Sequence, residues 1–215
     1  MDSLNMEKLF EFLKKNFLSL FLGIILIVSS LIFYVIYSTN QKNKTYASQE
    51  LYESYLNKFS TYDASELKNL EIKLNELKNN NPNSIYYYLA NFYQVKVYFE
   101  NDEELKALNL MQELNLTLEG ENSKKYFLRD LSRIRLASIF IDFERTEEAR
   151  EILKKSFSFY EALRLEKLGD LEKSIFNYKM AQNYYEMAIQ ESDNQTQINM
   201  LNFKLSSLAS ASNEN

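Results

Sequence analysis

The chain lacks the two side chains that most often do chemistry near neutral pH. Its 215 residues include no histidine and no cysteine, which removes the commonest general base, the commonest transition-metal ligand and every thiolate nucleophile. The 3 glycines, Gly23, Gly120 and Gly169, lie too far apart to build a phosphate-binding loop. Carboxylates, tyrosines and lysines remain, but they are spread along the chain without a clustered motif. The sequence therefore predicts no enzyme activity, no metal site and no cofactor.

The charge of the chain argues against a nucleic-acid ligand. Asp and Glu number 30 against 25 Lys and Arg, for a formal net charge of -5, and no block of basic residues stands out. Neutralising phosphates requires a basic face. The chain is instead rich in aromatic side chains, with 16 Tyr and 15 Phe. They can contact another polypeptide, but packing in a core between helices is the stronger interpretation of their number.

One apolar segment near the N-terminus, residues 17–37, contains no charged side chain. At about 1.5 Å of rise per residue, this segment covers the roughly 30 Å hydrocarbon core of a bilayer. A cleaved signal peptide has a shorter apolar stretch, about 7–15 residues, that ends in small side chains, whereas this one ends in Tyr34, Val35, Ile36 and Tyr37. We therefore expect an uncleaved transmembrane anchor whose aromatic end lies at the membrane–water interface.

The lysines that flank this anchor indicate its orientation. Three precede it and two follow closely, namely Lys8, Lys14 and Lys15, then Lys42 and Lys44. The positive-inside bias favours the side with more Lys and Arg as the cytoplasmic one, and long domains translocate largely regardless of charge. We expect residues 1–16 to be a cytoplasmic tail, with the C-terminal domain on the other side.

Beyond the anchor, the composition is that of an all-helical protein. A single proline and two glycines follow residue 37, and Leu, Glu, Lys and Ala recur at helical spacing without strand-length alternation. We expect a membrane-proximal helix over residues 38–61, into which the anchor can continue directly, and a helical domain over residues 62–215. Side chains that can cap a first turn predict helix starts at Asp63, Asn81-Pro82, Asp102, Thr146 and Asp170.

Three segments of this domain fit a tetratricopeptide repeat, a 34-residue helix pair with small residues where its helices cross. In the best match, Leu136-Ala137 and Phe140 occupy the first helix, residues 144–146 the turn, and Ala149 and Leu153 the second helix. An earlier unit has Leu89-Ala90 and Tyr93 before Ala107, and a later unit has Ala162, Leu165 and a turn at 168–170 before residues 181–188. An ordinary helical bundle would also contain Leu-Ala pairs, so that alternative stays open, as does whether residues 146–167 form one helix or two.

Together, the short tail, the single span, the degenerate repeats and the closing segment 202–208 resemble the YfgM-like family of membrane-anchored tetratricopeptide proteins. The resemblance implies an all-α protein with a single N-terminal transmembrane helix and a periplasmic repeat solenoid in the bacterial inner membrane. It further implies partners, namely the SecYEG translocon, a PpiD-like periplasmic chaperone and the unfolded secreted chains that they handle. A structural adaptor of another envelope complex, with the repeats acting as a rigid spacer, is the alternative.

If the units stack as a repeat superhelix, equivalent positions of consecutive units line its inner surface. These candidate partner-binding residues are Tyr87, Asn91 and Gln94 in one unit, and Ile134, Ser138 and Ile141 in the next. Apolar side chains on a concave face suit extended or partly unfolded chains. Packing of the same aromatics between units is the competing interpretation.

Overall fold

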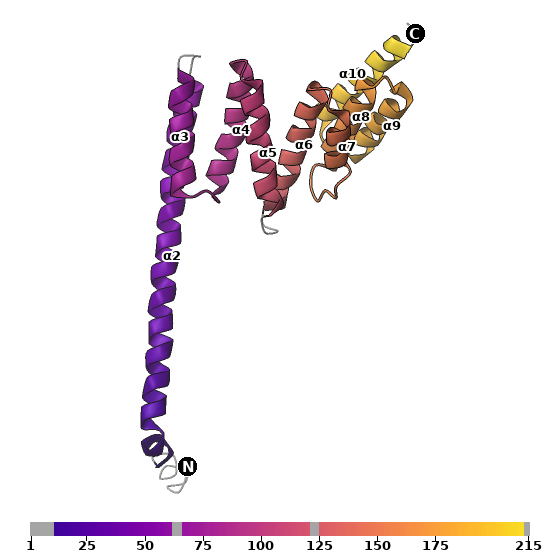
Figure 1. Ribbon diagram of the computed structural model, residues 1–215. Coiled ribbons are helices and arrows are strands. Elements are labelled where there is room, and N and C mark those ends of the chain that lie inside the picture. Colours follow the sequence, from indigo (N-terminus) through magenta and orange to yellow (C-terminus); the bar gives the residue numbers. More distant parts are fainter. Residues whose placement is uncertain (1–10, 62–65, 121–124, 213–215) are drawn as a thin grey trace.

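The computed structural model describes residues 11–61, 66–120 and 125–212, and within them the backbone forms helices and no strand. In chain order the helices are α2 (Phe17–Ser60), α3 (Leu67–Asn80), α4 (Ile85–Glu100), α5 (Glu104–Glu119), α6 (Tyr126–Asp142), α7 (Thr146–Leu153), α8 (Glu161–Ser174), α9 (Tyr178–Glu191) and α10 (Gln195–Ser212). Figure 1 shows α2 as a long rod and the later helices as an arm that extends sideways from its far half. The all-α prediction, with one N-terminal spanning-type helix before a repeat domain, is confirmed.

Helix α2 is long and apolar enough to cross a membrane. Its 44 residues correspond to about 66 Å of helix, and its most apolar window has a mean hydropathy of 2.4 with none of its residues buried in the protein. Leu26, Phe33 and Ile36 are more than half exposed, as expected for side chains that face lipid. The helix continues without interruption from the apolar segment into the membrane-proximal region.

The second half of α2 belongs to the packed core. Ser48 and Tyr55 are fully buried, and α2 packs against both α3 and α4. The Tyr55 hydroxyl donates to Gln94 Oε1 at 3.0 Å, and the Asn80 amide donates to Ser48 Oγ at 2.9 Å. The α2–α3 pair is therefore the first layer of the arm.

Three helix pairs share the same turn. Asp102, Glu144 and Phe176 have positive φ angles of 58°, 58° and 61° and lie in the α4–α5, α6–α7 and α8–α9 turns. In each turn the next residue donates its backbone N–H, over 2.8 Å, to the carbonyl five residues earlier, which closes the end of the first helix. Five residues after the positive-φ position comes a fully buried alanine, Ala107, Ala149 or Ala181. This shared geometry establishes three equivalent repeats.

The later repeat differs from the sequence expectation. Leu168, Gly169 and Asp170 lie inside α8, so the predicted turn at 168–170 and the predicted helix start at Asp170 are wrong. A Cβ at Gly169 would lie 2.4 Å from Tyr185 Cε1. The glycine is therefore needed for the close approach of α8 and α9 and does not end a helix. The actual turn, at Phe176, contains no glycine or proline to mark it in the sequence.

Of the remaining predicted helix starts, one is moved by a side-chain cap. Pro82 lies in a turn, and α4 begins only at Ile85, because Ser84 Oγ accepts from the Tyr87 N–H at 3.1 Å and caps the helix. The predicted starts near Asp102 and Thr146 are confirmed, since α5 and α7 begin within two residues of them. The one at Asp63 lies outside the described residues. Residues 146–167 contain two helices, α7 and α8, joined by residues 154–160.

Candidate functional site

A groove of about 420 Å³ opens between α4 and α6, the first helices of consecutive repeats. Helix α2 packs directly against α4, and α6 against α8, whereas the groove separates α4 from α6 and α5 packs between them. Apolar and small side chains make up much of its lining: Phe92, Val95, Phe99, Ser138 and Ile139. Its base is thus a preformed apolar surface of the kind that binds side chains of another molecule.

Charged side chains form the rim of this groove. Lys96 and Arg135 are exposed and also line it, as does Glu100. The Arg135 guanidinium carbon lies 5.6 Å from the centre of the Phe92 ring, and Lys96 Nζ pairs with Glu100 Oε1 at 3.4 Å. An apolar base with a mixed-charge rim favours a peptide segment over a fully apolar ligand.

The structure buries most of the residues predicted for the inner surface. Tyr87, Asn91, Gln94 and Ile134 each expose 8 % or less. Of the remaining two, Ser138 lines the groove, while Ile141 is half-buried against the core. The expectation that the six form one exposed stripe is therefore corrected for four of them, and a partner-binding role for the set stays a prediction.

Two of these buried residues, Asn91 and Gln94, are polar and form hydrogen bonds inside the protein. The Asn91 amide donates to the Tyr87 carbonyl at 2.6 Å, and both residues line a separate small cavity of about 90 Å³ next to α5. Gln94 accepts from the Tyr55 hydroxyl at 3.0 Å, so it joins α4 to α2. Asn91 therefore bonds within its own helix, and Gln94 connects two helices of the core.

A shift of five residues explains why the groove was missed. The sequence pattern aligned Ala90 with Ala137, but the positive-φ turns align Val95 with Ala137, because each lies seven residues before its turn. Moving Tyr87, Asn91 and Gln94 forward by five residues gives Phe92, Lys96 and Phe99, and all three line the groove. Five helical residues rotate the face by about 140°, which turns a surface stripe into a core stripe. The equal offsets of Ala107, Ala149 and Ala181 from acidic or aromatic turn residues were the signal that could have revealed the register.

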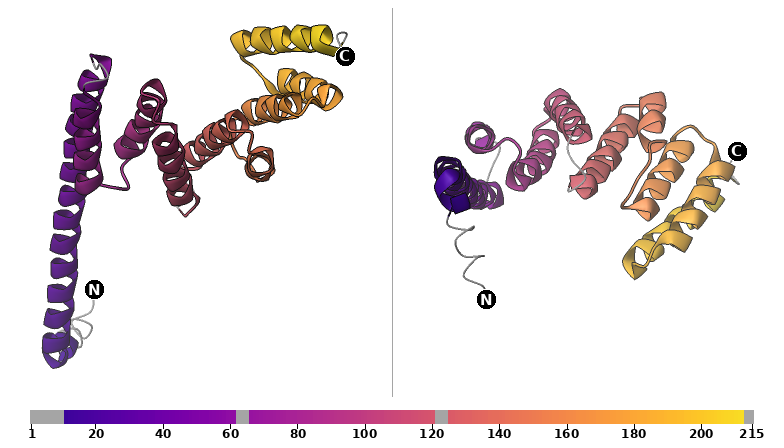
Figure 2. Two further views of the ribbon diagram at one scale, coloured as in Figure 1. Left: turned by 45° about the horizontal axis from the view of Figure 1, so that its top comes forward. Right: turned by 90° about the horizontal axis from the view of Figure 1, so that it is seen from below.

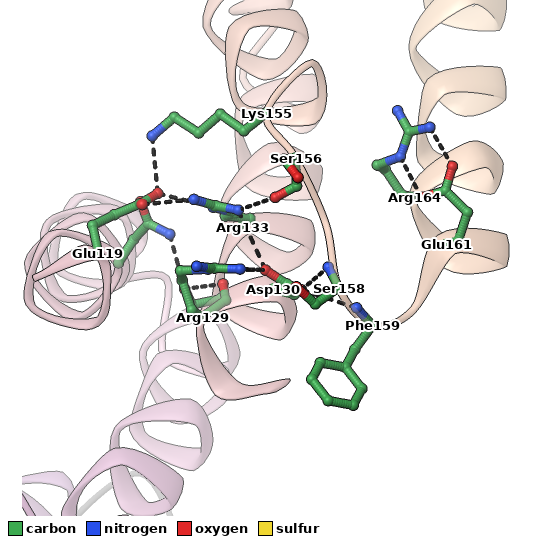
Figure 3. Close-up of polar contacts among 12 residues, drawn as sticks. Glu119, Arg129, Asp130, Arg133, Lys155, Ser156, Ser158, Phe159, Glu161 and Arg164 are labelled. Carbon is green, nitrogen blue, oxygen red and sulfur yellow. Dashed lines mark hydrogen bonds and ion pairs between the residues drawn. The ribbon is translucent and has the colours of Figure 1, made fainter. Parts of the chain in front are cut away.

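At the other end of α6, a buried carboxylate holds the α7–α8 connection in place (Figure 3). Asp130 is fully buried, and its Oδ2 accepts from the backbone N–H groups of Ser158 at 2.7 Å and Phe159 at 3.0 Å. Arg133 donates to the Ser156 carbonyl at 2.7 Å and forms a two-bond pair with Glu119 at 2.9 and 2.6 Å. This network was missed in the sequence, where Arg129, Asp130 and Arg133 stand among the other charged residues of α6 without a motif.

Hydrogen bonds from Arg133, followed by those from Lys155, hold the pKa of Glu119 well below its usual range, at about 2. Lys155 Nζ lies 2.9 Å from Glu119 Oε1. The carboxylate is thus ionised at any physiological pH and ties α5 to α6 and to the start of the connection. The contacts of this cluster join α5, α6 and the α7–α8 connection, so its role is structural.

A second polar cluster fixes the C-terminal helix. Lys204 of α10 donates to Asp170 Oδ1 at 2.6 Å and to Glu166 Oε1 at 2.7 Å, and the Tyr185 hydroxyl donates to Asp170 Oδ1 at 2.8 Å. Burial would raise the pKa of Asp170, but the positive charges of Lys167 and Lys204 outweigh it and lower the pKa. Across residues 11–61, 66–120 and 125–212, no group of three or more carboxylates is arranged to hold a metal ion.

Comparison with known proteins agrees with the repeat geometry. The family model described as a tetratricopeptide repeat-like domain matches residues 11–210, a range that includes α2 as well as the arm. No curated protein matches the chain. Because the family model covers almost the whole chain, and because three of its helix pairs share one turn geometry, the chain belongs to the tetratricopeptide repeat-like domain family.

Proposed function

We propose that this protein is a membrane-anchored interaction scaffold whose α4–α6 groove binds an extended, partly apolar segment of a partner protein. The groove itself is the observation that carries the proposal, since Phe92, Phe99 and Ile139 present apolar surface between two charged rims. Tetratricopeptide domains mediate protein–protein interactions, and repeat arrays use such extended surfaces for binding. The protein acts by binding and does not catalyse a reaction.

The YfgM-like resemblance supports a more specific assignment. In this assignment, α2 spans the bacterial inner membrane, the N-terminus is cytoplasmic and the arm is periplasmic. The groove receives unfolded secreted chains as they emerge from the SecYEG translocon, next to a PpiD-like chaperone. The exposed apolar surface of α2 supports the anchor, and the groove supports capture of unfolded segments.

Filling the groove tests the binding site. Ser138 lines it and is half-buried, so Ser138→Phe should occlude the groove without removing a core side chain. Ser206→Phe on α10 is a matched control, because both hydroxyls bond a carbonyl in the preceding turn of their own helix and Ser206 is exposed.

Crosslinking in membranes, with the full chain, should recover partner polypeptides from the wild type and from Ser206→Phe, and markedly fewer from Ser138→Phe. Translocon subunits and newly secreted chains among the products would support the specific assignment. Equal recovery from both variants, at unchanged helicity, would place the binding surface elsewhere.

The unbroken helix α2 favours a second candidate function, the structural adaptor. A continuous 44-residue helix with no proline places the arm at a fixed height above the membrane, as a spacer would. An adaptor predicts crosslinks to one constant set of envelope subunits that Ser138→Phe does not change. A chaperone that holds unfolded chains predicts crosslinks to a varying set of clients, and Ser138→Phe should reduce these crosslinks.

Orientation can be tested with a single thiol. Because the chain has no cysteine, Ser206→Cys introduces its only sulfhydryl, at an exposed position on α10. A membrane-impermeant maleimide should label it in intact spheroplasts. Labelling that appears only after lysis would reverse the proposed orientation.

A further inference from the structure

One edge of the arm faces the membrane side, that is, the N-terminal half of α2 with the apolar segment 17–37. Helix α3 runs antiparallel to α2, and the Asn80 amide at its C-terminal end donates to the Lys44 carbonyl at 3.2 Å. Lys44 lies seven residues beyond Tyr37, which is about 10 Å along the helix. A headgroup layer is roughly 5–8 Å thick on each side of the hydrocarbon core. With residues 17–37 in the bilayer, the end of α3 therefore lies just above the headgroups.

The α7–α8 connection lies at the same edge. Figure 1 places it, like the α3–α4 connection, on the side of the arm nearer the N-terminal end of α2, whereas the α4–α5 turn lies on the opposite side. The right-hand view of Figure 2, from below, looks along α2 from its N-terminal end and shows the arm spreading away to one side. A tilt of α2 toward the arm, of about 20° as is common for transmembrane helices, brings this edge closer to the membrane.

The connection, residues 154–160, is held rigid and displays two aromatic side chains. Phe159 and Tyr160 are 49 % and 41 % exposed. The Asp130 carboxylate accepts from the Ser158 and Phe159 N–H groups, as Figure 3 shows. Tyr160 adopts a φ of 61°, a left-handed conformation that is strained for a residue with a Cβ. The bonds that the buried Asp130 carboxylate accepts hold the backbone of the connection just before Tyr160, where both rings lie at the surface.

Basic side chains accompany the two rings. Lys154 and Lys155 are exposed at the start of the connection, and Lys42 and Lys44 are exposed where α2 leaves the apolar segment. The acidic neighbours are balanced by basic ones: Glu119 pairs with both Arg133 and Lys155, Glu151 with Lys154 and Glu161 with Arg164. Lys154 and Lys155 therefore contact phosphate as members of ion pairs and not as free charges. In a chain of net charge -5, this edge is therefore not an acidic one.

We propose that the 154–160 connection is a second membrane contact, in which Phe159 and Tyr160 enter the headgroup layer of the bilayer that α2 spans and Lys154 and Lys155 lie near lipid phosphates. Aromatic rings and lysines favour this layer because they combine an apolar body with a polar or charged end. The contact fixes the arm at two points and so determines which way the α4–α6 groove faces. The proposal rests on the membrane anchor of the proposed function.

The absence of tryptophan from the chain makes a direct test available. Phe159→Trp gives the full chain a single tryptophan at the proposed contact, and Tyr160→Trp gives a second reporter next to it. Leu105→Trp, at an exposed position of α5 next to the α4–α5 turn, is the matched control on the opposite edge. Leu26→Trp reports on insertion of α2 itself. Each variant is reconstituted into vesicles of phosphatidylcholine and phosphatidylglycerol in which part of the lipid carries a nitroxide near its headgroup.

Nitroxide lipid should quench the tryptophan fluorescence of Phe159→Trp and Tyr160→Trp at least about twofold more strongly than that of Leu105→Trp. Their emission should also be blue-shifted, because an interfacial ring lies at headgroup level. Equal quenching of Phe159→Trp and Leu105→Trp, with Leu26→Trp still protected from aqueous iodide, would overturn the second contact and leave the anchor intact. If iodide reaches Leu26→Trp as readily as it reaches Leu105→Trp, the anchor fails and the second contact fails with it.

Discussion

At the scale of single residues, the clearest determinant of the repeat packing is Gly169. Alanine is favoured over glycine by about 1 kcal/mol in a helix interior, but a Cβ here would lie 2.4 Å from Tyr185 Cε1. The Tyr185 ring cannot move aside easily, because it is fully buried and its hydroxyl bonds Asp170. We expect Gly169→Ala to lower the free energy of unfolding by about 1–3 kcal/mol, measured as a lower thermal midpoint of helicity.

Gly120 supplies the control for this substitution. It follows α5, and its nearest neighbour for an added Cβ is the Thr117 carbonyl oxygen at 3.6 Å, an ordinary contact. Gly120→Ala should leave the thermal midpoint unchanged or raise it slightly. A higher midpoint for Gly169→Ala would mean that α8 and α9 do not approach as closely as described.

Glu119 makes stability depend on acid. Its folded pKa of about 2 lies below the ordinary 4.5, chiefly because of the hydrogen bonds from Arg133. The pair is therefore fully stabilising above about pH 4.5 and loses its contribution as the pH falls toward 2. After allowance for solvent screening this contribution is about 1–2 kcal/mol. Urea unfolding should be less sensitive to pH in this window for Glu119→Gln. Glu151→Gln, at an exposed carboxylate, controls for the loss of a surface charge.

At the scale of helices, sequence periodicity was enough to predict helices but not their register. Asp102 and Thr146 marked true helix starts, although no side chain caps α5 or α7, because an acidic first turn follows each of them. Gly169 misled because glycine serves both to end helices and to let them pack closely, and sequence alone does not separate the two roles. The α4–α6 groove depends on which faces of two repeats meet, so the five-residue slip in one unit was sufficient to miss it.

The shared turns allow a prediction at this scale. Glu144 is an exposed residue with a φ of 58°, which strains a side chain that carries a Cβ but not glycine. Glu144→Gly should therefore raise the free energy of unfolding by about 0.5–1 kcal/mol, seen as a higher urea midpoint.

The same chemical change inside a helix should have the opposite sign. Glu151 is exposed within α7, so Glu151→Gly should cost about 1 kcal/mol. If both substitutions lower the midpoint equally, the left-handed turn that the three repeats share is not maintained in solution.

For the whole molecule, the important feature is that α2 has two roles. The described side chains of its first half are mostly apolar and exposed, which suits lipid, and its second half buries Ser48 and Tyr55 in the first layer of the arm. The anchor was evident from composition, whereas the packing of the membrane-proximal helix was not, because the contacts that bury it come from α3 and α4. Membrane anchor and arm are thus one rigid element at their junction, and any tilt of the span is transmitted directly to the groove.

This double role predicts where the chain can be truncated. Residues 43–215 retain the part of α2 that packs against α3 and α4, and we expect this fragment to be soluble and strongly helical. Residues 62–215 would lose Tyr55 and uncover Leu70, Leu74 and Leu77, the buried face of α3. Exposing a buried leucine costs roughly 1.5–3 kcal/mol, so the three together approach the 5–15 kcal/mol that typically stabilises a domain. The shorter fragment should show lost helicity or aggregation by circular dichroism and size-exclusion chromatography, and equal helicity per residue in the two fragments would mean that α2 contributes nothing to the fold of the arm.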